Sequence, residues 1–326
     1  NFGGGNLRFP ILKAPFPWFG GKSRVAHLVW ERFGNVVNFV EPFAGSLGVL
    51  LARPHVDIGT ETVNDLDCMI SNFWRAVQAE SDRVAEFADW PVNENDLSAR
   101  HAWLVGQKEN LQSKLEGNPD YYDCKIAGWW VWGMSCWIGS GFCSGKGPWQ
   151  VVEGKLVLLG NDGRGVNRQL VHLGGDGRGV NRKLGNLIAY MRQIQDRLRR
   201  VRVCCGDWKR ICTPAAMGLD RFKSIGIFLD PPYAYNQNRH KDLYFMDSKD
   251  VAYEARDWAI EQGTNPKLRI AYCGYEGLEF PSDWSVLKWK ANGGYENQGD
   301  SPSENRKRET IWFSPACNRI EQPGLI

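Results

Sequence analysis

The sequence lacks a strong excess of either charge: 40 Lys and Arg face 37 Asp and Glu, for a net charge of +3. Nucleic-acid binding therefore cannot be inferred from the total charge and would have to come from local clusters of basic residues. There is also no apolar run long enough to span a membrane, and no signal peptide is expected. The five histidines show no ligand spacing, so no metal site is expected.

Cysteine is present but not in pairs. The nine cysteines are an odd number without a CxxC motif, and Cys204 and Cys205 are adjacent. This spacing excludes an ordinary disulfide framework and a zinc site, and it favours reduced thiols in a cytosolic protein. The 326 residues, 43% of them hydrophobic, are enough for one large domain or two small ones.

One short apolar run, residues 224–229, ends abruptly in Asp230-Pro231-Pro232-Tyr233. Its length suits a strand buried on both faces of a parallel sheet, and the prolines must end it because they have no N–H to donate. Open α/β sheets bind ligands at this carboxyl end of their strands. A carboxylate and a backbone carbonyl there can accept both N–H bonds of a nucleobase amine, while the aromatic ring stacks on a flipped base. The alternative is a sharp turn without a ligand.

Two glycine-containing loops precede this strand. Residues 17–23 read Pro-Trp-Phe-Gly-Gly-Lys-Ser and enter a predicted helix, where Ser23 could act as the cap and free N–H groups favour an anion. This spacing is not that of a phosphate loop, and a plain capped turn explains it equally well. Residues 41–48 read Glu-Pro-Phe-Ala-Gly-Ser-Leu-Gly, between a predicted strand at 36–40 and a predicted helix from residue 49. This is the layout of a nucleotide-cofactor loop without the dinucleotide fingerprint.

Further acids follow other predicted strands. A second strand, within 56–63, ends in Asn64-Asp65-Leu66-Asp67, and an acid about twenty residues after a glycine loop is placed to hold ribose hydroxyls. The alternative is that Asn64 or Asp65 caps the helix predicted from Cys68. After a third strand at 201–205, Asp207 and Trp208 either bind a purine or start the next helix. The segments 267–273, 284–289 and 309–313 are further predicted strands, the last two as an edge hairpin.

The composition changes between about residues 80 and 200. A polar helical stretch at 97–115 and a Gly-rich aromatic run at 129–142 lead to a tandem repeat at 156–183, in which Gly-Arg-Gly-Val-Asn-Arg occurs twice. Its arginines suit phosphates and base edges, and a duplicated flexible loop is the equal alternative. They are Arg164, Arg168, Arg178 and Arg182. Apolar residues at helical spacing then predict an amphipathic helix over 184–198.

Taken together, these pieces resemble the Dam-like class of DNA adenine N6-methyltransferases, in particular phage-encoded members. In that family a Trp-x-Gly-Gly-Lys loop opens the chain, a Glu-Pro-Phe-x-Gly loop holds S-adenosylmethionine, an acid on the second strand takes the ribose, and Asp-Pro-Pro-Tyr holds the target adenine. The matching segments here are 18–22, 41–45, Asp65 and 230–233. Pro17 stands where relatives often carry lysine.

The resemblance implies a Rossmann-like, doubly wound and mostly parallel α/β core formed by residues 1–80 and 200–326. An inserted, partly helical region at 81–199 would read double-stranded DNA. The expected catalytic residues are Asp230, Pro231, Pro232 and Tyr233. The expected cofactor-binding residues are Trp18, Phe19, Gly20, Lys22, Glu41, Pro42, Phe43, Ala44, Gly45, Ser46, Asn64, Asp65, Asp207, Trp208 and Asp230. The expected DNA contacts are Lys22, Arg24 and the four arginines of the repeat.

The implied reaction is direct, in-line methyl transfer without a covalent enzyme intermediate, driven by positioning and electrostatics. The expected enzyme is a monomer acting on DNA in the bacterial or phage-infected cytoplasm, and protection of DNA from restriction is one hypothesis for its purpose. The same motif logic also serves N4-cytosine methylation, and RNA is not distinguished from DNA. A non-catalytic DNA-binding relative and a phosphate-binding hydrolase built on residues 20–23 are the alternatives from other classes.

Overall fold

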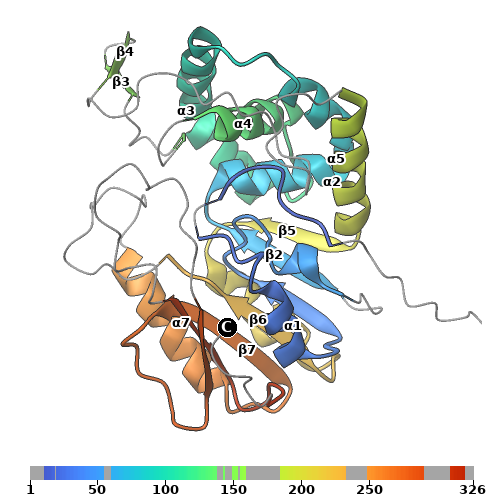
Figure 1. Ribbon diagram of the computed structural model, residues 1–326, viewed down its shortest axis with the longest axis vertical. Coiled ribbons are helices and arrows are strands. Elements are labelled where there is room, and N and C mark those ends of the chain that lie inside the picture. Colours follow the sequence, from blue (N-terminus) through green and yellow to red (C-terminus); the bar gives the residue numbers. More distant parts are fainter. Residues whose placement is uncertain are drawn as a thin grey trace, which may run out of the picture.

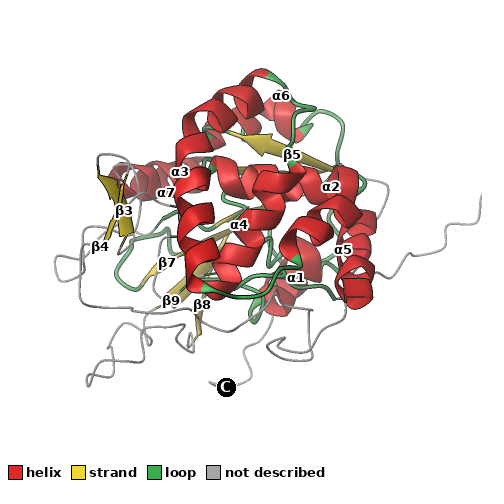
Figure 2. Cartoon of the chain, turned by 90° about the horizontal axis from the view of Figure 1, so that it is seen from above, coloured by secondary structure: helices red, strands yellow, loops and turns green. Residues whose placement is uncertain are grey.

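The computed structural model describes residues 11–18, 20–54, 60–137, 142–143, 149–152, 155–158, 184–232, 248–289 and 309–319. They include a seven-stranded sheet. Figure 1 and Figure 2 show helices on both faces of this sheet. The strands are β1 (Asn38–Glu41), β2 (Glu61–Asp65), β5 (Val201–Cys205), β6 (Ile225–Leu229), β7 (Leu268–Tyr275), β8 (Ser285–Trp289) and β9 (Glu309–Phe313). In this described part of the chain, no helix has the length and apolar content needed to cross a membrane.

The strand order confirms the predicted doubly wound α/β architecture. The order is β5-β2-β1-β6-β7-β9-β8, and the first five strands run parallel. The chain moves outward from β1 in one direction and from β6 in the other, so the topological switch point lies between these two strands. The predicted antiparallel pair β8 and β9 is also present, but β9 lies between β7 and β8, so only β8 forms the edge.

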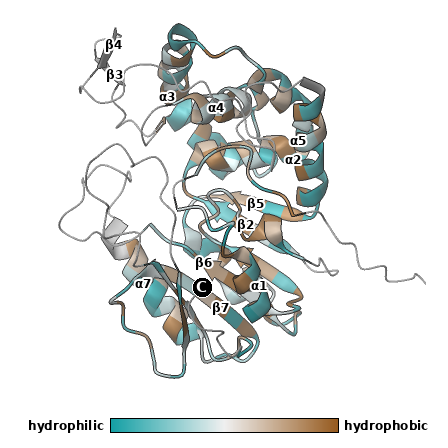
Figure 3. Cartoon of the chain, viewed as in Figure 1, coloured by the Kyte–Doolittle hydropathy of each residue, from teal (hydrophilic) through white to brown (hydrophobic). Residues whose placement is uncertain are grey.

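Both faces of the sheet are covered, which explains why its central strands are apolar throughout. One face carries α1 (Ala26–Phe33), α2 (Cys68–Ala88), α3 (Glu94–Gly117), α4 (Cys124–Cys136) and α5 (Leu184–Leu198). The other carries η2 (Trp208–Ile211), α6 (Pro214–Met217) and α7 (Ser248–Gln262). Figure 3 shows hydrophobic residues along β6 and β7 and mixed colours on the helices around them. A separate hairpin is formed by β3 (Trp149–Val152) and β4 (Lys155–Leu158).

The strand β6 is buried along its whole length, as its apolar sequence predicts. Its residues alternate between the two faces: Phe228 packs with the α1–α5 side, whereas Ile227 and Leu229 pack with the α7 side. A Cβ atom on Gly226 would lie 3.2 Å from the Phe33 ring and 3.1 Å from Val36, so glycine here lets α1 approach the sheet closely. The strand therefore delivers Asp230 from a rigid, fully packed support.

The helices of the predicted insertion share a core with the rest of the chain. The predicted boundary near residue 80 coincides with a kink in α2, where Glu80 has φ −140° and ψ 63°. Phe16 packs against Phe73 at 5.3 Å and, across that boundary, against Trp130 of α4 at 4.9 Å between ring centroids. One continuous hydrophobic cluster thus joins the N-terminal segment, the sheet and α2–α5.

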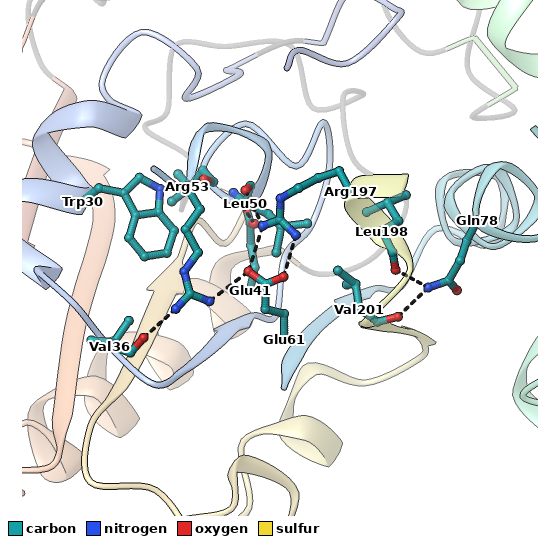
Figure 4. Close-up of polar contacts among 11 residues, drawn as sticks. Trp30, Val36, Glu41, Leu50, Arg53, Glu61, Gln78, Arg197, Leu198 and Val201 are labelled. Carbon is teal, nitrogen blue, oxygen red and sulfur yellow. Dashed lines mark hydrogen bonds and ion pairs between the residues drawn. The ribbon is translucent and has the colours of Figure 1, made fainter. Parts of the chain in front are cut away.

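Three buried charged side chains fasten α5 to the amino end of β2 (Figure 4). Glu61 accepts hydrogen bonds from Arg53 at 3.0 Å and from Arg197 at 2.6 and 2.8 Å, and all three side chains are 1% exposed. Arg197 also donates to the Leu50 carbonyl, and Arg53 donates to the Val36 carbonyl. This network lies at the end of the sheet opposite to the carboxyl ends of the strands.

Several local predictions are wrong because capping depends on one or two residues. Ser23 does not cap α1, which begins at Ala26 without a side-chain cap. Asp67, rather than Asn64 or Asp65, caps α2 by accepting from the Met69 N–H at 2.9 Å. The helix expected from residue 49 is only the 3-10 turn η1 (Leu50–Ala52).

The predicted amphipathic helix over 184–198 is confirmed as α5. Residues 56–58 and most of the repeat, 159–183, lie outside the described residues.

Candidate active site

Acidic side chains stand at or just beyond the carboxyl ends of three parallel strands, at the same edge of the sheet. Asp65 is the last residue of β2, Asp207 follows β5 closely, and Asp230 comes directly after β6. Asp65 and Asp230 are partly buried, whereas Asp207 is exposed. Because β1 and β6 flank the switch point, this edge is where a doubly wound sheet binds its ligand. The structure thus brings together acids that the sequence separates by up to 165 positions.

The loop at 17–23 contributes a buried cation to this edge. The ammonium of Lys22 donates to a carboxylate oxygen of Asp230 at 2.8 Å and to the Gly20 carbonyl at 2.7 Å. The Lys22 side chain is 3% exposed and that of Asp230 is 21% exposed. A buried charge pair of this kind needs good hydrogen-bond geometry to offset desolvation. Lys22 therefore positions Asp230, and its burial argues against the expected contact with a DNA phosphate.

A second carboxylate lies close to the same ammonium. Glu309, the first residue of β9, is 8% exposed and has an oxygen 3.9 Å from the Lys22 nitrogen. Burial alone would lower the pKa of Lys22, but the charges of Asp230 and Glu309 raise it above the ordinary value of 10.5. Burial also raises the pKa of the neighbouring Cys273 thiol well above 9. At neutral pH the Lys22 amine is therefore protonated and the Cys273 thiol is neutral.

The loop at 41–48 is held over the end of β2 by Asp65. One oxygen of Asp65 accepts from the Gly45 N–H at 2.9 Å, and the other accepts from the Asp67 N–H at 2.9 Å. The Ala44 N–H donates to the Asn64 carbonyl at 2.8 Å, and the Asn64 amide donates to the Pro42 and Gly206 carbonyls. Asp65, which is predicted to bind the ribose, therefore also holds the loop that is predicted to bind the cofactor. Asn64 supports the same loop.

Two glycines let the loops at 17–23 and 41–48 interlock. A Cβ atom on Gly45, where φ is +45°, would lie 2.6 Å from the Trp18 indole nitrogen. A Cβ atom on Gly48 would lie 2.9 Å from the Ser23 backbone nitrogen. On the other side, the Trp74 indole N–H donates to the Gly45 carbonyl at 2.9 Å. The two predicted motifs are thus one packed unit, which the sequence presented as separate loops.

The Glu41 side chain is buried beneath the two packed loops and does not face solvent. It is 2% exposed, and its carboxylate accepts from the Leu50 N–H at 3.2 Å. Burial raises the pKa of Glu41 well above 4.5. This places Glu41 as a brace between the loop and η1, and its predicted contact with a cofactor stays a prediction. Pro42, Ala44 and Gly45 are buried, and Phe43 and Ser46 are half-buried.

For Asp207 and Trp208, the structure confirms the helix-start interpretation. Asp207 caps η2 by accepting from the Lys209 N–H at 2.7 Å. Trp208 is 5% exposed and packs against Phe43 at 5.8 Å and Trp258 at 6.0 Å between ring centroids. Its indole belongs to the core and presents no open stacking face. The exposed carboxylate of Asp207 keeps free acceptor capacity for a ligand.

A cavity of about 210 Å³ lies beneath this region, between β2, β5 and the segment that follows β5. Its wall is formed by Thr62, Asn64, Arg202, Cys204, Arg210, Ile211 and Ala216. Asn64 is the member of the predicted site that contributes to this wall, and Asp230 does not line it. The cavity is therefore not the place where chemistry at Asp230 would occur.

Sequence reasoning missed two residues of this edge. Leu66, between Asp65 and Asp67, is 51% exposed, which gives an apolar surface beside the ribose-binding candidate. Its exposure could have been suspected, because it stands between polar residues at a strand end. Glu309 had no local signal beyond being an acid at the start of an apolar strand. Its proximity to Lys22 depends on the pairing of β9 with β7.

The remaining predicted residues are placed only in part. Pro231 is buried, and Trp18, Gly20 and Pro232 are half-buried at the same edge, while Arg24 is exposed just before α1. The following predicted site residues lie outside the described residues: Phe19, Tyr233, Arg164, Arg168, Arg178 and Arg182. Within the described ranges no three His, Cys, Asp or Glu side chains gather as metal ligands. All nine cysteines, each in the described part, are free thiols.

The carboxyl of Asp65 has a property that can be tested directly. Burial raises its pKa from 3.8 to about 6, although the Gly45 and Asp67 N–H bonds oppose this shift. If Asp65 holds ribose hydroxyls, S-adenosylmethionine affinity should be full above pH 7 and weaken as the pH falls through about 6, because the protonated acid accepts less strongly. Asp65→Asn should weaken binding about tenfold or more at pH 8 and remove the pH step. Isothermal calorimetry between pH 5 and 8 measures both.

The matched control is Asp67→Asn, because asparagine also caps a helix and the neighbouring loop is unchanged. Its affinity and pH dependence should follow the wild-type protein. An Asp65→Asn variant that binds the cofactor with wild-type affinity at pH 5 and at pH 8 would rule out the ribose role of Asp65.

No protein-family model matches this chain, and no curated protein matches it. At the site itself, a carboxylate fixed by a buried lysine follows the central strand of the sheet.

Proposed function

We propose that this protein is a DNA methyltransferase that transfers the methyl group of S-adenosylmethionine to N6 of an adenine flipped out of double-stranded DNA. The observation that carries the proposal is the placement of Asp230. It follows β6 at the switch point, it is oriented by Lys22 at 2.8 Å, and it is followed by two prolines. The two prolines have no backbone N–H group that could donate to the Asp230 carboxylate. This carboxylate therefore suits a substrate that brings its own N–H donors.

The chemistry of an aromatic amine explains why these groups are needed. The lone pair of the amine is delocalised into the base, which makes the nitrogen a poor nucleophile. Hydrogen bonds from the amine to Asp230 and to the carbonyl that follows it favour a tetrahedral nitrogen, whose lone pair can then attack. The nitrogen becomes cationic as the N–C bond forms and the S–C bond breaks, and a nearby carboxylate stabilises that charge. The cationic nitrogen is acidic and would then lose its proton to Asp230 or to water, so Asp230 need not be a strong base.

The residues at the neighbouring strand ends fit the proposed methyl donor. Asp65 and Asp207 supply acceptors for hydroxyl and amine groups, and the exposed Leu66 supplies an apolar surface for a ring. Bound S-adenosylmethionine would supply an activated methyl group on a sulfonium. The loop at 41–48, clamped by Asp65 and Trp74, would keep the amino-acid end of that molecule close to β1.

Under this proposal, the helices α3, α4 and α5 form the main part of a region that reads DNA, inserted into a methyltransferase core. The support is the order of the chain, which leaves the sheet after β2 and returns at β5. The arginines of the repeat and the exposed Arg24 remain the proposed phosphate contacts.

The first test is incubation of the protein with labelled S-adenosylmethionine and unmethylated bacterial DNA, followed by mass spectrometry of the nucleosides. We expect N6-methyladenine, and sequencing of the modified DNA would give the recognition site. N4-methylcytosine would move the target to the other exocyclic amine and overturn the adenine assignment. A parallel reaction with RNA separates the two nucleic acids. Cofactor binding without any methylated product would favour a non-catalytic relative.

A further inference from the structure

The buried Lys22 creates a problem for the proposed reaction. Its ammonium already occupies one oxygen of Asp230 at 2.8 Å, and this carboxylate is the group to which the target amine must donate. The side chain of Asp230 is only 21% exposed, so few approaches to it remain. The ammonium thus stands where an incoming N–H donor would compete with it. An amine that donates to this same oxygen would weaken its contact with Lys22.

Moving the ammonium away from Asp230 would separate two opposite charges in a buried place. Lys22 is 3% exposed, so little water can replace the lost contact. The Gly20 carbonyl, 2.7 Å away, can keep one hydrogen bond but brings no negative charge. Glu309 offers a second carboxylate whose oxygen is 3.9 Å from the same nitrogen. A small rotation of the lysine tip would bring the two into direct contact.

We propose that Glu309 is a positioning residue that takes over the Lys22 ammonium when the target amine binds to Asp230. The inference rests on the proposed function and adds a residue from β9, at the far end of the chain, to that site. It assigns Glu309 no contact with the substrate; Glu309 acts through Lys22. The lysine then moves between two carboxylates, one of which is released for the substrate.

The test is a double-mutant cycle with Glu309→Gln and Lys22→Met, read out as the single-turnover rate of adenine methylation. Glu309→Gln should slow the rate by about 10- to 100-fold, the scale of coupling between contacting groups. Its affinity for S-adenosylmethionine should not change, because Glu309 is not assigned to the cofactor. The double variant should be no slower than Lys22→Met alone, because the proposed role of Glu309 acts through the lysine. A purely structural role would instead give additive losses.

Two controls make the result specific. Glu276→Gln removes an exposed carboxylate that pairs with Lys288 just beyond β7, and it should leave the rate unchanged. Glu309→Asp keeps the charge but withdraws it by one methylene, so its rate should lie between those of the wild type and Glu309→Gln. This second variant also keeps the test valid if Glu309→Gln folds poorly in a thermal melt.

The outcomes separate the inference from the proposed function. A wild-type protein that methylates DNA, combined with additive losses or with an unaffected Glu309→Gln variant, would overturn the role of Glu309 alone. A wild-type protein that methylates no base would overturn the proposed function, and the inference would fall with it.

Discussion

Replacing Asp230 by asparagine is expected to reduce methyl transfer by about 1,000-fold or more, the effect of removing a charge-stabilising group from an active site. Asparagine keeps the shape of the side chain but turns one acceptor into an NH₂ donor, which opposes the N–H of the target amine. It also removes the negative charge that would stabilise the cationic nitrogen. The affinity for S-adenosylmethionine should be nearly unchanged, because the proposed ribose contact lies on β2.

Single-turnover methylation and calorimetric cofactor binding measure the two halves of this expectation. Asp220→Asn is the matched control: it is an exposed acid in the turn before β6, and its variant should be fully active. An Asp230→Asn variant that methylates DNA at a rate close to wild type would remove the central assignment. Loss of cofactor binding together with activity would instead indicate that the variant disturbs the whole edge of the sheet.

The second large effect is expected on stability, at the opposite end of β2. Glu61→Gln should lower the free energy of unfolding by about 3–5 kcal/mol, because it removes the buried carboxylate that two buried guanidinium groups share. Arg53 and Arg197 are each 1% exposed, so water cannot replace the lost carboxylate. The amide of glutamine would also direct an N–H group at one of the arginines. Urea unfolding followed by circular dichroism measures the change.

The helix α5, which carries Arg197, also provides the control for this prediction. Arg192 of α5 pairs with Asp82, but these side chains are 61% and 44% exposed. Asp82→Asn should therefore cost less than about 1 kcal/mol, as is usual for surface ion pairs. If Glu61→Gln and Asp82→Asn had equally small effects, the buried network would not be a main attachment of α5. Cofactor binding by Glu61→Gln at low temperature should stay intact, since the network is remote from Asp65.

The parts of the fold that the sequence predicted well are those set by long, uniform patterns. The apolar run 225–229 has no polar position that could face water, so a strand with both faces covered was the direct interpretation. The helical spacing over 184–198 predicted α5 for the same reason. These elements are defined by many residues acting together, and a single substitution would not change the pattern.

The wrong predictions concern features defined by one or two residues. Asp67 rather than Asp65 caps α2, because the Asp65 carboxylate is already engaged with the Gly45 N–H from a loop twenty residues earlier. The sequence shows several acids in a row but not which of them has a competing partner. The indole of Trp208 was a candidate stacking surface, yet η2 turns it into the core beside Phe43.

The candidate site was predictable as a set of loops but not as a set of contacts. Its acids stand at strand ends, and parallel strands bring such ends to one edge. The pairing of Lys22 with Asp230 spans 208 positions, and no local pattern encodes it. Glu309 is further away still, and it reaches the site only because β9 inserts between β7 and β8. Tertiary pairing, rather than local propensity, therefore determines which charges meet.

The position of β1 beside β6 also has a consequence for synthesis of the chain. Asn38 of β1 pairs with Ile225 of β6, so the central strand keeps one bare edge until a partner 187 residues later (225 minus 38) leaves the ribosome. At about 5–20 residues per second, this takes on the order of ten to forty seconds. During that time the strand is an open template for pairing with other chains. We expect the nascent N-terminal part to depend on chaperones, and a fragment ending before β6 to aggregate.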